Sequence, residues 1–554
     1  MFGLVALVYI VDLGRTPVYF GGDEAHFAVV GHSIATTGRN LNGDLMPLFI
    51  SLADPTSDLQ PMPWGNTWYQ PFLFYLVAAV LTVAPLSEFM VRLPVAIIGG
   101  VVTPVLVYLV ALRLFRTRPL ALFSAVVFAL TPPQVILSRQ ALDYVCPLPF
   151  ILGWLWFLID YTENQPTMQS PRRGGPEKTR RLRSLLIGGL CLGVGFYSYI
   201  ASWVMMPIYI ALSVLVFWRV PFDSRSGSGA SPDRSLRATR VLRPLLASIA
   251  GFVLPLLVFI PWLWTHPAML RETFDRYQMS DQEQVSLIQE PQNAFRLDKL
   301  AATVSTYWSY FDPSFLFMIG GPSMTTSTGR IGVFLVPLAV LLPLGAFTLL
   351  RRPDPYGLHA LILLAVVTAP IAATLKGQPF MAQRVLFMLP FAALIATYGL
   401  EWLWQPPRRA ARALVIALIA IGAVQFGLFY RDYFTHYKLR SAFYYDPAAL
   451  GEVSKYLLAD RQAPLIYLSI ELDDVGAKWR YYTTRDGRTE LMEKTRFVLN
   501  DGLDIGPGDA GSLLAVHTKT EQLGWLERSG LWKIEKVVAD VDNRPTVAIL
   551  RKVR

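Results

Sequence analysis

The segment Arg92–Leu112, RLPVAIIGGVVTPVLVYLVAL, decides the fold class of this chain. The 20 residues after Arg92 carry no charge, and about 20 apolar residues are what an α-helix needs to cross a bilayer. Similar runs recur along the 554 residues, of which 53% are hydrophobic and only 16% are charged. Because soluble proteins carry roughly 25% charged residues, this composition excludes a soluble enzyme and a disordered chain. We therefore predict an α-helical polytopic membrane protein.

The net charge of +10 is concentrated in short segments between the apolar runs. Five such segments hold 20 of the 50 Lys and Arg side chains but only six of the 40 acidic ones. They are residues 113–118, 160–184, 219–243, 351–357 and 405–412. Short basic loops mark the cytoplasmic side of a membrane protein, so the excess charge indicates topology and does not predict a nucleic-acid partner.

About 11 transmembrane helices fit between these loops, and they place all five basic segments on one face and the C-terminal tail on the other. The predicted spans are residues 2–11, 92–112, 120–137, 145–160, 185–200, 202–218, 244–264, 331–350, 358–375, 385–404 and 413–429. The first run is only about half a span long, so we expect it to belong to a longer helix. It lacks the basic start and the cleavage site of a signal peptide.

The apolar stretch Pro71–Leu86 is short for a span, and we expect an interfacial helix there. This choice keeps the acidic loop 12–91 on the same side of the membrane as Asp143. The alternative, a further crossing, would move residues 12–70 to the cytoplasmic side.

Two domains are predicted, a transmembrane domain over residues 1–430 and a small extracytoplasmic α/β domain over residues 431–554. The transmembrane part carries two long outer loops, 12–91 and 265–330, and the second loop holds a mixed-charge helical stretch at 271–300. In the terminal domain the pattern predicts one helix, two strands and a hairpin across Asp542-Asn543. They are Pro447–Leu458, Leu465–Leu472, Leu513–Thr518, and Leu531–Ala539 paired with Val547–Val553.

The densest group of reactive side chains is Gly21–Phe27, GGDEAHF. It opens an amphipathic helix whose Phe27, Val30 and Ile34 share one face, with Gly38 as its C-terminal stop. Asp23 is either the N-cap of that helix or a carboxylate at the membrane surface that takes a proton from a hydroxyl group. Glu24 and His26 beside it are assigned to the same site.

A second polar group, Leu137–Asp143, LSRQALD, stands where the third span emerges. Arg139 and Asp143 are four residues apart and could simply pair on one helical face. The predicted topology, however, brings Asp143 out on the same side as Asp23. Two acids and an arginine at one interface predict a polar functional site.

Few cationic side chains are predicted near that interface, and they are Arg92, Lys376 and Arg384. They are either snorkelling anchors or the groups that hold a phosphate at headgroup depth, where arginine gives a bidentate grip. Tyr69 and Gln70, with the nearby tryptophans Trp64 and Trp68, could contact a sugar, although for the tryptophans an aromatic belt is the preferred interpretation. No phosphate-binding loop, dinucleotide fingerprint or Cys/His metal spacing occurs, so a lipid-linked donor fits best.

The ordered set of motifs resembles the GT-C glycosyltransferases of family 39 over about residues 12–430. The matching elements are Asp23-Glu24, Thr37-Gly38, Trp68–Pro71, Ser87–Pro94, Ser138-Arg139 with Asp143, Gly195–Tyr199, Phe311–Phe317 and Gln383-Arg384 before Met388–Pro390. The resemblance implies a GT-C fold, a polyprenyl-phosphate sugar donor and an extracytoplasmic active site. It also implies that Asp23 is the base with Glu24 beside it, and that Asp143 and Arg92 belong to the site. One departure is that Gly320-Gly321-Pro322 replaces a Gly-Asp-Pro element, and Thr325-Thr326 stands where a histidine is expected.

From these observations we expect an inverting glycosyltransferase, multi-pass in the cell inner (plasma) membrane, with its active site facing the periplasm or exterior. Asp23 is the expected base, and Arg92 with Arg384 or Lys376 stabilises the departing phosphate. Glu24 and Asp143 position the sugar or the acceptor, which is a protein, a lipid or a glycan. A divalent cation is left open. The alternative is a secondary transporter, which predicts inverted repeats and ionisable groups near mid-span.

Overall fold

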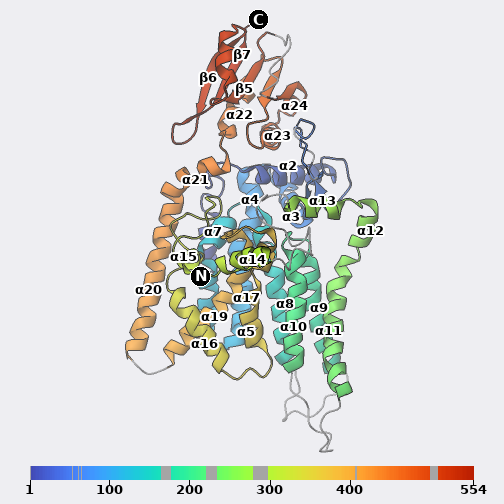
Figure 1. Cartoon of the computed structure of the whole chain (residues 1–554), viewed down its shortest axis with the longest axis vertical. Coiled ribbons are helices and arrows are strands. Elements are labelled where there is room, and N and C mark those ends of the chain that lie inside the picture. The colour runs from blue at the N-terminus through green and yellow to red at the C-terminus, as the bar shows by residue number, and fades with distance from the viewer. Residues whose placement is uncertain are drawn as a thin grey trace, which may run out of the picture.

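The computed structural model describes residues 2–52, 54–59, 61–63, 65–163, 176–219, 234–278, 297–405, 409–499 and 510–553. The predicted belt residue Trp64 lies outside these residues. A bundle of long helices carries a small domain with a β-sheet at one end (Figure 1). We call this end of the bundle the outer end.

The segment that opened the sequence analysis forms the central rod of the bundle. Helix α4 (Glu88–Ile97) runs through a π-helical turn, η1 (Ile98–Val102), into α5 (Thr103–Phe115). Two glycines in η1 allow close packing: a Cβ atom on Gly99 would lie 1.8 Å from Oγ of Ser138, and one on Gly100 would lie 2.4 Å from the ring of Tyr9. A small-residue contact therefore joins this rod to its neighbours.

Seven helices of the described residues are long and apolar enough to cross a membrane, which makes this a multi-pass membrane architecture. They are Glu88–Phe115, Asp143–Glu163, Ser202–Arg219, Val241–Thr265, Leu358–Lys376, Leu386–Trp404 and Arg409–Tyr445. Three further bundle helices were also predicted as spans: α6 (Arg118–Ala129), α9 (Pro176–Gly195) and α16 (Leu338–Arg351). They are shorter than predicted or charged at one end. For example, α6 stops before Pro132 and Pro133 and a separate α7 (Pro132–Leu137) follows, because a residue before proline is disfavoured in the helical conformation.

The other labelled helices of this part either belong to the spans named above or complete the bundle and its outer surface. They are α1 (Phe2–Ile10), η2 (Asp143–Val145), α8 (Leu148–Glu163), α10 (Ser202–Arg219), α11 (Arg234–Leu256), α12 (Phe259–Thr265), α13 (Met269–Gln278), α14 (Leu297–Ser309), α15 (Pro313–Phe317), α17 (Leu358–Thr368), α18 (Ile371–Lys376), η4 (Ala382–Arg384), η5 (Leu386–Met388) and α19 (Leu389–Trp404). The junction of α16 with α17, which holds one of the basic segments, lies at the end of the bundle opposite the sheet (Figure 1).

Helix α2 (Gly22–Thr37) lies across the outer end, and α3 (Pro71–Leu81) packs beside it (Figure 1). The predicted buried face of α2 is present, since Phe27, Val30 and Ile34 are all buried, and Gly38 ends the helix with a φ of 71°. The N-cap is Gly21 rather than Asp23. Asp23 therefore stands inside the first turn and its side chain is not used as a cap.

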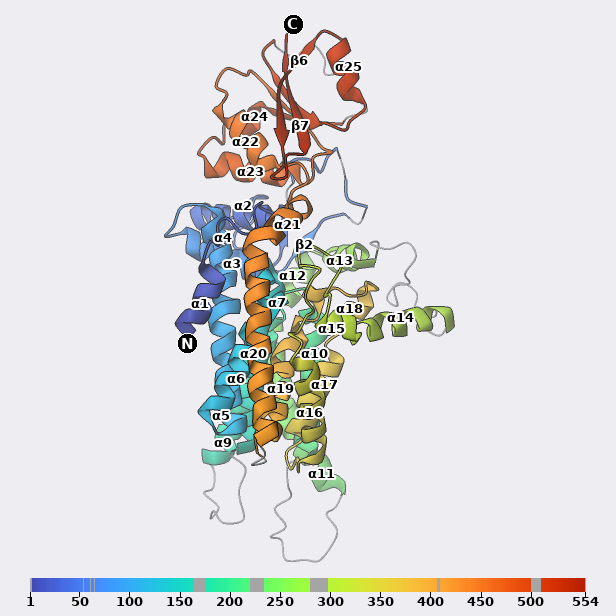
Figure 2. The ribbon, with the colours of Figure 1, turned by 90° about the vertical axis from the view of Figure 1, so that its left-hand side faces the viewer.

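The membrane part and the terminal domain are joined by one helical rod. Helix α20 (Arg409–Asp432) continues through η6 (Tyr433–Tyr437) into α21 (Lys438–Tyr445), which ends beneath the sheet domain (Figure 2). The boundary predicted between residues 430 and 431 thus falls inside continuous helix, and the α/β domain starts after Tyr445.

A five-stranded sheet with the order β4-β3-β5-β7-β6 forms the terminal domain. Its elements are α22 (Leu450–Ala459), β3 (Ile466–Ser469), α23 (Val475–Arg485), α24 (Leu491–Lys494), β4 (Thr495–Val498), β5 (Leu513–His517), α25 (Gln522–Arg528), β6 (Trp532–Ala539) and β7 (Pro545–Lys552). Strand β3 pairs in parallel with β4 and β5, whereas β7 is antiparallel to both β5 and β6. The predicted helix, both strands and the terminal hairpin are present. Helix α23 packs against α2 and so docks the domain on the outer end.

Candidate active site

A cavity of about 370 Å³ opens at the outer end of the bundle beneath α2 and α13. It is lined by Asp23, Phe27, Trp68, Tyr69, Gln70, Leu142, Asp143, Tyr144, Tyr199, Ile200, Arg276, Tyr277, Lys376 and Arg384. Six of the ten predicted site residues are therefore in one place: Asp23, Tyr69, Gln70, Asp143, Lys376 and Arg384. They come from five separate stretches of the chain.

Asp23 enters the cavity from the first turn of α2. Its Oδ1 atom accepts a hydrogen bond of 2.6 Å from the hydroxyl of Tyr69, and Nη2 of Arg276 donates to that hydroxyl at 3.1 Å. A helix N-terminus favours a negative charge, so this position suits a carboxylate. Asp143 reaches the same cavity from the start of η2.

Tyr69 and Gln70 are placed by a short strand pair followed by a helix start. Strand β2 (Trp68–Tyr69) pairs with β1 (Ile50–Ser51), so that Tyr69 lies opposite Ile50. Gln70 is then the N-cap of α3, and Pro71 occupies its first turn, where a missing N–H costs nothing. The Gln70 side chain is buried, and its Oε1 atom has no hydrogen-bond partner among the described residues.

The cationic wall of the cavity consists of Arg276, Lys376 and Arg384. Nη1 of Arg276 and Nε of Arg384 are buried N–H groups without a hydrogen-bond partner in the described part of the chain. The ammonium group of Lys376 lies 5.2 Å from the ring centre of Tyr277. A buried donor left unpaired costs about 1–3 kcal/mol, and two arginines that line one cavity each carry such a donor.

Helix α13, which carries Arg276, is fastened over the cavity by Glu272. Nε1 of Trp68 donates to one carboxylate oxygen of Glu272 at 2.6 Å, and the amide of Asn66 donates to the other at 3.3 Å. Trp68 therefore holds the wall of the cavity in place, rather than belonging to an aromatic belt.

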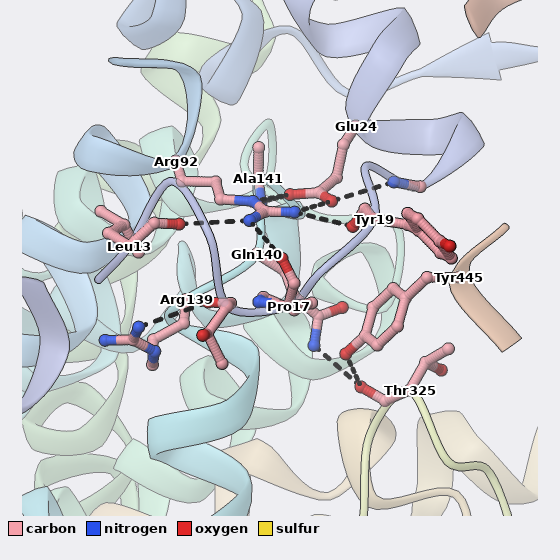
Figure 3. A network of polar contacts seen from close by, with 12 residues as sticks. Leu13, Pro17, Tyr19, Glu24, Arg92, Arg139, Gln140, Ala141, Thr325 and Tyr445 are labelled. Atoms are coloured by element: carbon pink, nitrogen blue, oxygen red, sulfur yellow. Dashed lines mark hydrogen bonds and ion pairs between the residues drawn. The ribbon is translucent and has the colours of Figure 1, made fainter. Parts of the chain in front are cut away.

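Arg92 does not line this cavity, and its hydrogen bonds do not support the predicted role in binding the phosphate. It is 1% exposed and its five N–H groups are all used (Figure 3). Two of them donate to Glu24, at 2.8 and 2.9 Å, and three donate to the backbone carbonyls of Leu13, Pro17 and Tyr19 at 3.0–3.1 Å. No donor remains for a ligand.

Glu24 is likewise a structural residue and not a group that contacts substrate. Besides Arg92, it accepts hydrogen bonds from the backbone N–H of Gly21 at 3.1 Å and of Ala141 at 2.8 Å (Figure 3). Glu24 thus joins the start of α2 to α4 and to the segment that leads to Asp143. This buried brace fixes where Asp23 and Asp143 stand relative to each other.

Arg139 was predicted to bind substrate or to pair with Asp143, and the structure contradicts both. Its side chain is fully buried and donates to the backbone carbonyls of Val8, Tyr9, Val11 and Thr16 at 2.7–3.3 Å. Arg139 therefore anchors the chain that follows α1. The helix in which Arg139 and Asp143 would have shared a face ends at Leu137.

His26 also lies outside the cavity lining, so its assignment to substrate binding is not supported. Its Nε2 atom is 3.9 Å from a carboxylate oxygen of Asp54. Burial lowers the pKa of His26, although the nearby charges of Asp23 and Asp54 act in the opposite direction.

Thr325 stands where the family pattern would place a histidine, and it is used as a backbone contact. Its carbonyl oxygen accepts from the amide of Gln140 at 2.8 Å and from the hydroxyl of Tyr445 at 3.1 Å (Figure 3). The contact ties the second outer loop to α21.

Sequence reasoning missed four polar side chains of the cavity: Tyr144, Tyr199, Arg276 and Tyr277. The signal for Arg276 was present, since it lies in the mixed-charge helical stretch of the second outer loop. Nothing in one sequence distinguishes Arg276 from the other charged residues there, because its distance from Tyr69 is a tertiary property.

Within the described ranges, no group of three or more His, Cys, Asp or Glu side chains is arranged to hold a metal ion. The two carboxylates of the cavity, Asp23 and Asp143, are accompanied by cationic side chains.

Known structures share this architecture over the whole chain. ArnT from Cupriavidus metallidurans, solved with undecaprenyl phosphate, matches 99% of this chain and 97% of its own length with a TM-score of 0.57 at 14% sequence identity. The chain has the GT-C glycosyltransferase fold. Apo ArnT matches it with a TM-score of 0.54 over 99% of this chain and 96% of ArnT, at 14% identity.

The archaeal oligosaccharyltransferase AglB from Archaeoglobus fulgidus, in complex with an inhibitory peptide and a dolichol-phosphate, is more distant, with a TM-score of 0.48 and 14% identity over 87% of this chain and 63% of AglB. No family model and no curated protein sequence matches the chain.

Proposed function

We propose that this protein is an integral-membrane glycosyltransferase that moves a sugar from a polyprenyl-phosphate donor to an acceptor hydroxyl. One observation carries the proposal: two buried arginine donors without a partner, on Arg276 and Arg384, share a cavity with the carboxylates of Asp23 and Asp143. Such a cavity suits a ligand with a phosphate at one end and hydroxyl groups at the other. The GT-C fold is consistent with this chemistry.

The donor phosphate binds between Arg276 and Arg384, with Lys376 as a third positive charge. A guanidinium group matches two phosphate oxygens at once. These fixed charges stabilise the negative charge that develops as the sugar leaves the phosphate. The polyprenyl tail lies in the surrounding lipid.

Transfer follows a single displacement at the anomeric carbon. The acceptor hydroxyl forms a new C–O bond on the face opposite the phosphate while its proton passes to the carboxylate of Asp23. The bond between the anomeric carbon and the phosphate oxygen breaks with both electrons on that oxygen. The products are an inverted glycoside and a polyprenyl phosphate, and Asp23 then returns its proton to water.

Asp143 and Gln70 position the sugar in this scheme. The free Oε1 atom of Gln70 accepts a hydrogen bond from a sugar hydroxyl, which satisfies an atom that is otherwise buried without a partner. Asp143, which lines the same cavity, accepts from another hydroxyl. Tyr144 and Tyr199 also line the cavity, with ring centres 5.3 Å apart.

The reaction takes place on the exterior or periplasmic face of the cell inner (plasma) membrane. The cavity is at the end of the bundle that carries the sheet domain, opposite the junction of α16 and α17 with its basic residues (Figure 1), and basic junctions face the cytoplasm. The acceptor, a protein, a lipid or a glycan, approaches from the side of the sheet domain.

The decisive experiment is a transfer assay with purified protein in liposomes. Radiolabelled polyprenyl-phosphate sugars are supplied with candidate acceptors, and both labelled product and polyprenyl phosphate are measured. We expect Asp23→Asn to reduce turnover about 100- to 10,000-fold, because general-base catalysis contributes about 10²–10⁴-fold. Asp58→Asn, an exposed acid of the same loop, is the matched control. Transfer by Asp23→Asn at the wild-type rate would refute the assigned base, and uptake of label into the lumen without product would indicate a transporter.

A further inference from the structure

The hydroxyl group of Tyr69 lies between Asp23, the proposed base, and Arg276, which is proposed to bind the phosphate. It is 2.6 Å from Oδ1 of Asp23 and 3.1 Å from Nη2 of Arg276. The guanidinium carbon of Arg276 lies 4.7 Å from the centre of the Tyr69 ring. Sequence reasoning had assigned Tyr69 to the sugar, but one face of the ring is covered by Arg276 and its hydroxyl is already bonded on both sides.

The two hydrogen bonds that link Arg276, Tyr69 and Asp23 run in one direction. Burial raises the pKa of Tyr69 well above its ordinary value, and the charge of Asp23 raises it further. Tyr69 is therefore a neutral phenol with one proton. Arginine can only donate, so the phenol oxygen accepts from Arg276 and the phenol proton is donated to Asp23.

We propose that Tyr69 is a positioning residue of the transfer reaction, which holds Oδ1 of Asp23 and leaves Oδ2 for the acceptor hydroxyl. This inference rests on the function proposed above. Tyr69 fixes the rotation of a carboxylate that is otherwise exposed at the cavity mouth. It also connects the base to Arg276, so that a phosphate held by Arg276 and a hydroxyl held by Asp23 are kept at a set separation.

The hydrogen bond from Tyr69 to the carboxylate is a charge-assisted contact, which holds the carboxylate in one orientation. The titratable groups around Asp23 come from four places: His26 on α2, Asp143 and Tyr144 at η2, Arg276 and Tyr277 on α13, and Asp474 in the terminal domain. Among these and the other described residues, Tyr69 alone is hydrogen-bonded to the Asp23 side chain.

Substitution of Tyr69 by phenylalanine tests the role with little change in packing. The ring keeps its edge contacts with Phe27 and Phe74, at 5.9 and 6.2 Å between centres, and only the hydroxyl is lost. We expect Tyr69→Phe to lower kcat by about 10- to 100-fold, the loss for a hydrogen bond to a charged group. The KM for the lipid donor should stay within about twofold.

The pH profile separates positioning from a merely structural effect. The acid limb of kcat/KM should move up by about one pH unit in Tyr69→Phe, because the ionised carboxylate has lost a donor. Tyr199→Phe is the matched control: it removes a hydroxyl from the same cavity that is not bonded to Asp23, and its acid limb should stay in place. An unshifted limb with wild-type kcat in Tyr69→Phe would overturn the proposal.

A fluorinated tyrosine at position 69 provides a second test that does not depend on the phenylalanine variant folding. Fluorination makes the phenol a stronger donor, so the acid limb should move in the opposite direction, to lower pH. No movement, or movement in the same direction as for phenylalanine, contradicts the role. If Asp23→Asn remains active, the base itself is misassigned; if it is inactive and neither Tyr69 variant shifts the profile, only the present inference fails.

Discussion

Two kinds of arginine occupy the outer end of the bundle, and they differ in what surrounds their N–H groups. Arg92 is enclosed by one carboxylate and three carbonyls, which use all five of its donors. Arg276 and Arg384 line a cavity, and each retains a buried donor without a partner in the described residues. The first environment is complete without a ligand, and the second is not.

This difference separates the frame of the site from its binding groups. Glu24 is the neighbour of Asp23 in sequence, and Arg92 belongs to one of the matching motifs. Both residues nevertheless hold the backbone that carries Asp23 and the segment before Asp143. The buried ion pair of Glu24 and Arg92 has no N–H group left to bind a ligand. Removal of one partner, however, is strongly destabilising. Variants of the two arginine types should therefore fail in different ways.

The largest effect is expected from Arg92→Met. It leaves the Glu24 carboxylate buried without its cation, and breaking a buried pair costs about 3–5 kcal/mol. The protein should lose thermal stability, measured as the midpoint of aggregation in detergent, and activity should fall together with the folded fraction. The double variant Glu24→Gln/Arg92→Met should be less destabilised than the sum of its single changes. A stable Arg92→Met protein with weak donor binding would mean that Arg92 is a ligand group after all.

A smaller effect, on binding and not on folding, is expected from Arg276→Gln and from Arg384→Gln. Each change removes a charge-assisted contact with phosphate, which is worth about 1.5–3 kcal/mol, or roughly 10- to 100-fold in kcat/KM for the donor. Thermal unfolding should be unchanged or improved, because an unpaired buried donor is lost. The affinity for the lipid donor and the unfolding midpoint are measured for both variants and compared with those of Arg92→Met. An equal loss of stability in all three variants would contradict the proposed difference between the two kinds of arginine.

The smallest effect concerns the contact between the terminal domain and α2. A Cβ atom on Gly22 would lie 1.6 Å from Oδ2 of Asp474, so this carboxyl lies against the first turn of α2. Loss of water around it, together with the charge of Asp473, raises the pKa of Asp474 to about 6. Because the folded protein favours the protonated form, this contribution to stability is complete below about pH 4 and is lost as the pH rises through about 6.

Asp474→Asn checks the sign of this pH dependence. The variant cannot ionise, so the difference in unfolding midpoint between pH 5 and pH 7.5 should be smaller in Asp474→Asn than in the wild type, by a degree or so at most given the exposure of the group. A larger difference in the variant contradicts the assignment.

The fold was predictable from sequence because its signals are local. Long apolar runs, basic loops and the short apolar run of Leu513–Val516 each depend only on nearby residues. One predicted span failed for an equally local reason, since prolines at 132 and 133 shorten it.

The site was predictable only as far as side-chain type and membrane face. Asp23 and Asp143 were found because the predicted topology brings both to one face, and Arg384 because cationic side chains are few near that interface. Whether an arginine side chain is hydrogen-bonded to backbone carbonyls or lines a cavity depends on residues far away in sequence. Arg92 and Leu13, for example, are 79 residues apart. Arg276 was missed for the same reason, since only the tertiary fold brings it to Tyr69, 207 residues away.

The most direct test of the account is an experimental structure of the protein with undecaprenyl phosphate in lipid nanodiscs. We predict density for the phosphate within hydrogen-bond distance of the guanidinium groups of Arg276 and Arg384, with Arg92 still bonded to Glu24. A second cavity of about 350 Å³ lies beneath the sheet domain and is lined by Arg92, Lys455 and Arg485. A phosphate bound there, or bound by Arg92, would contradict the proposed active site.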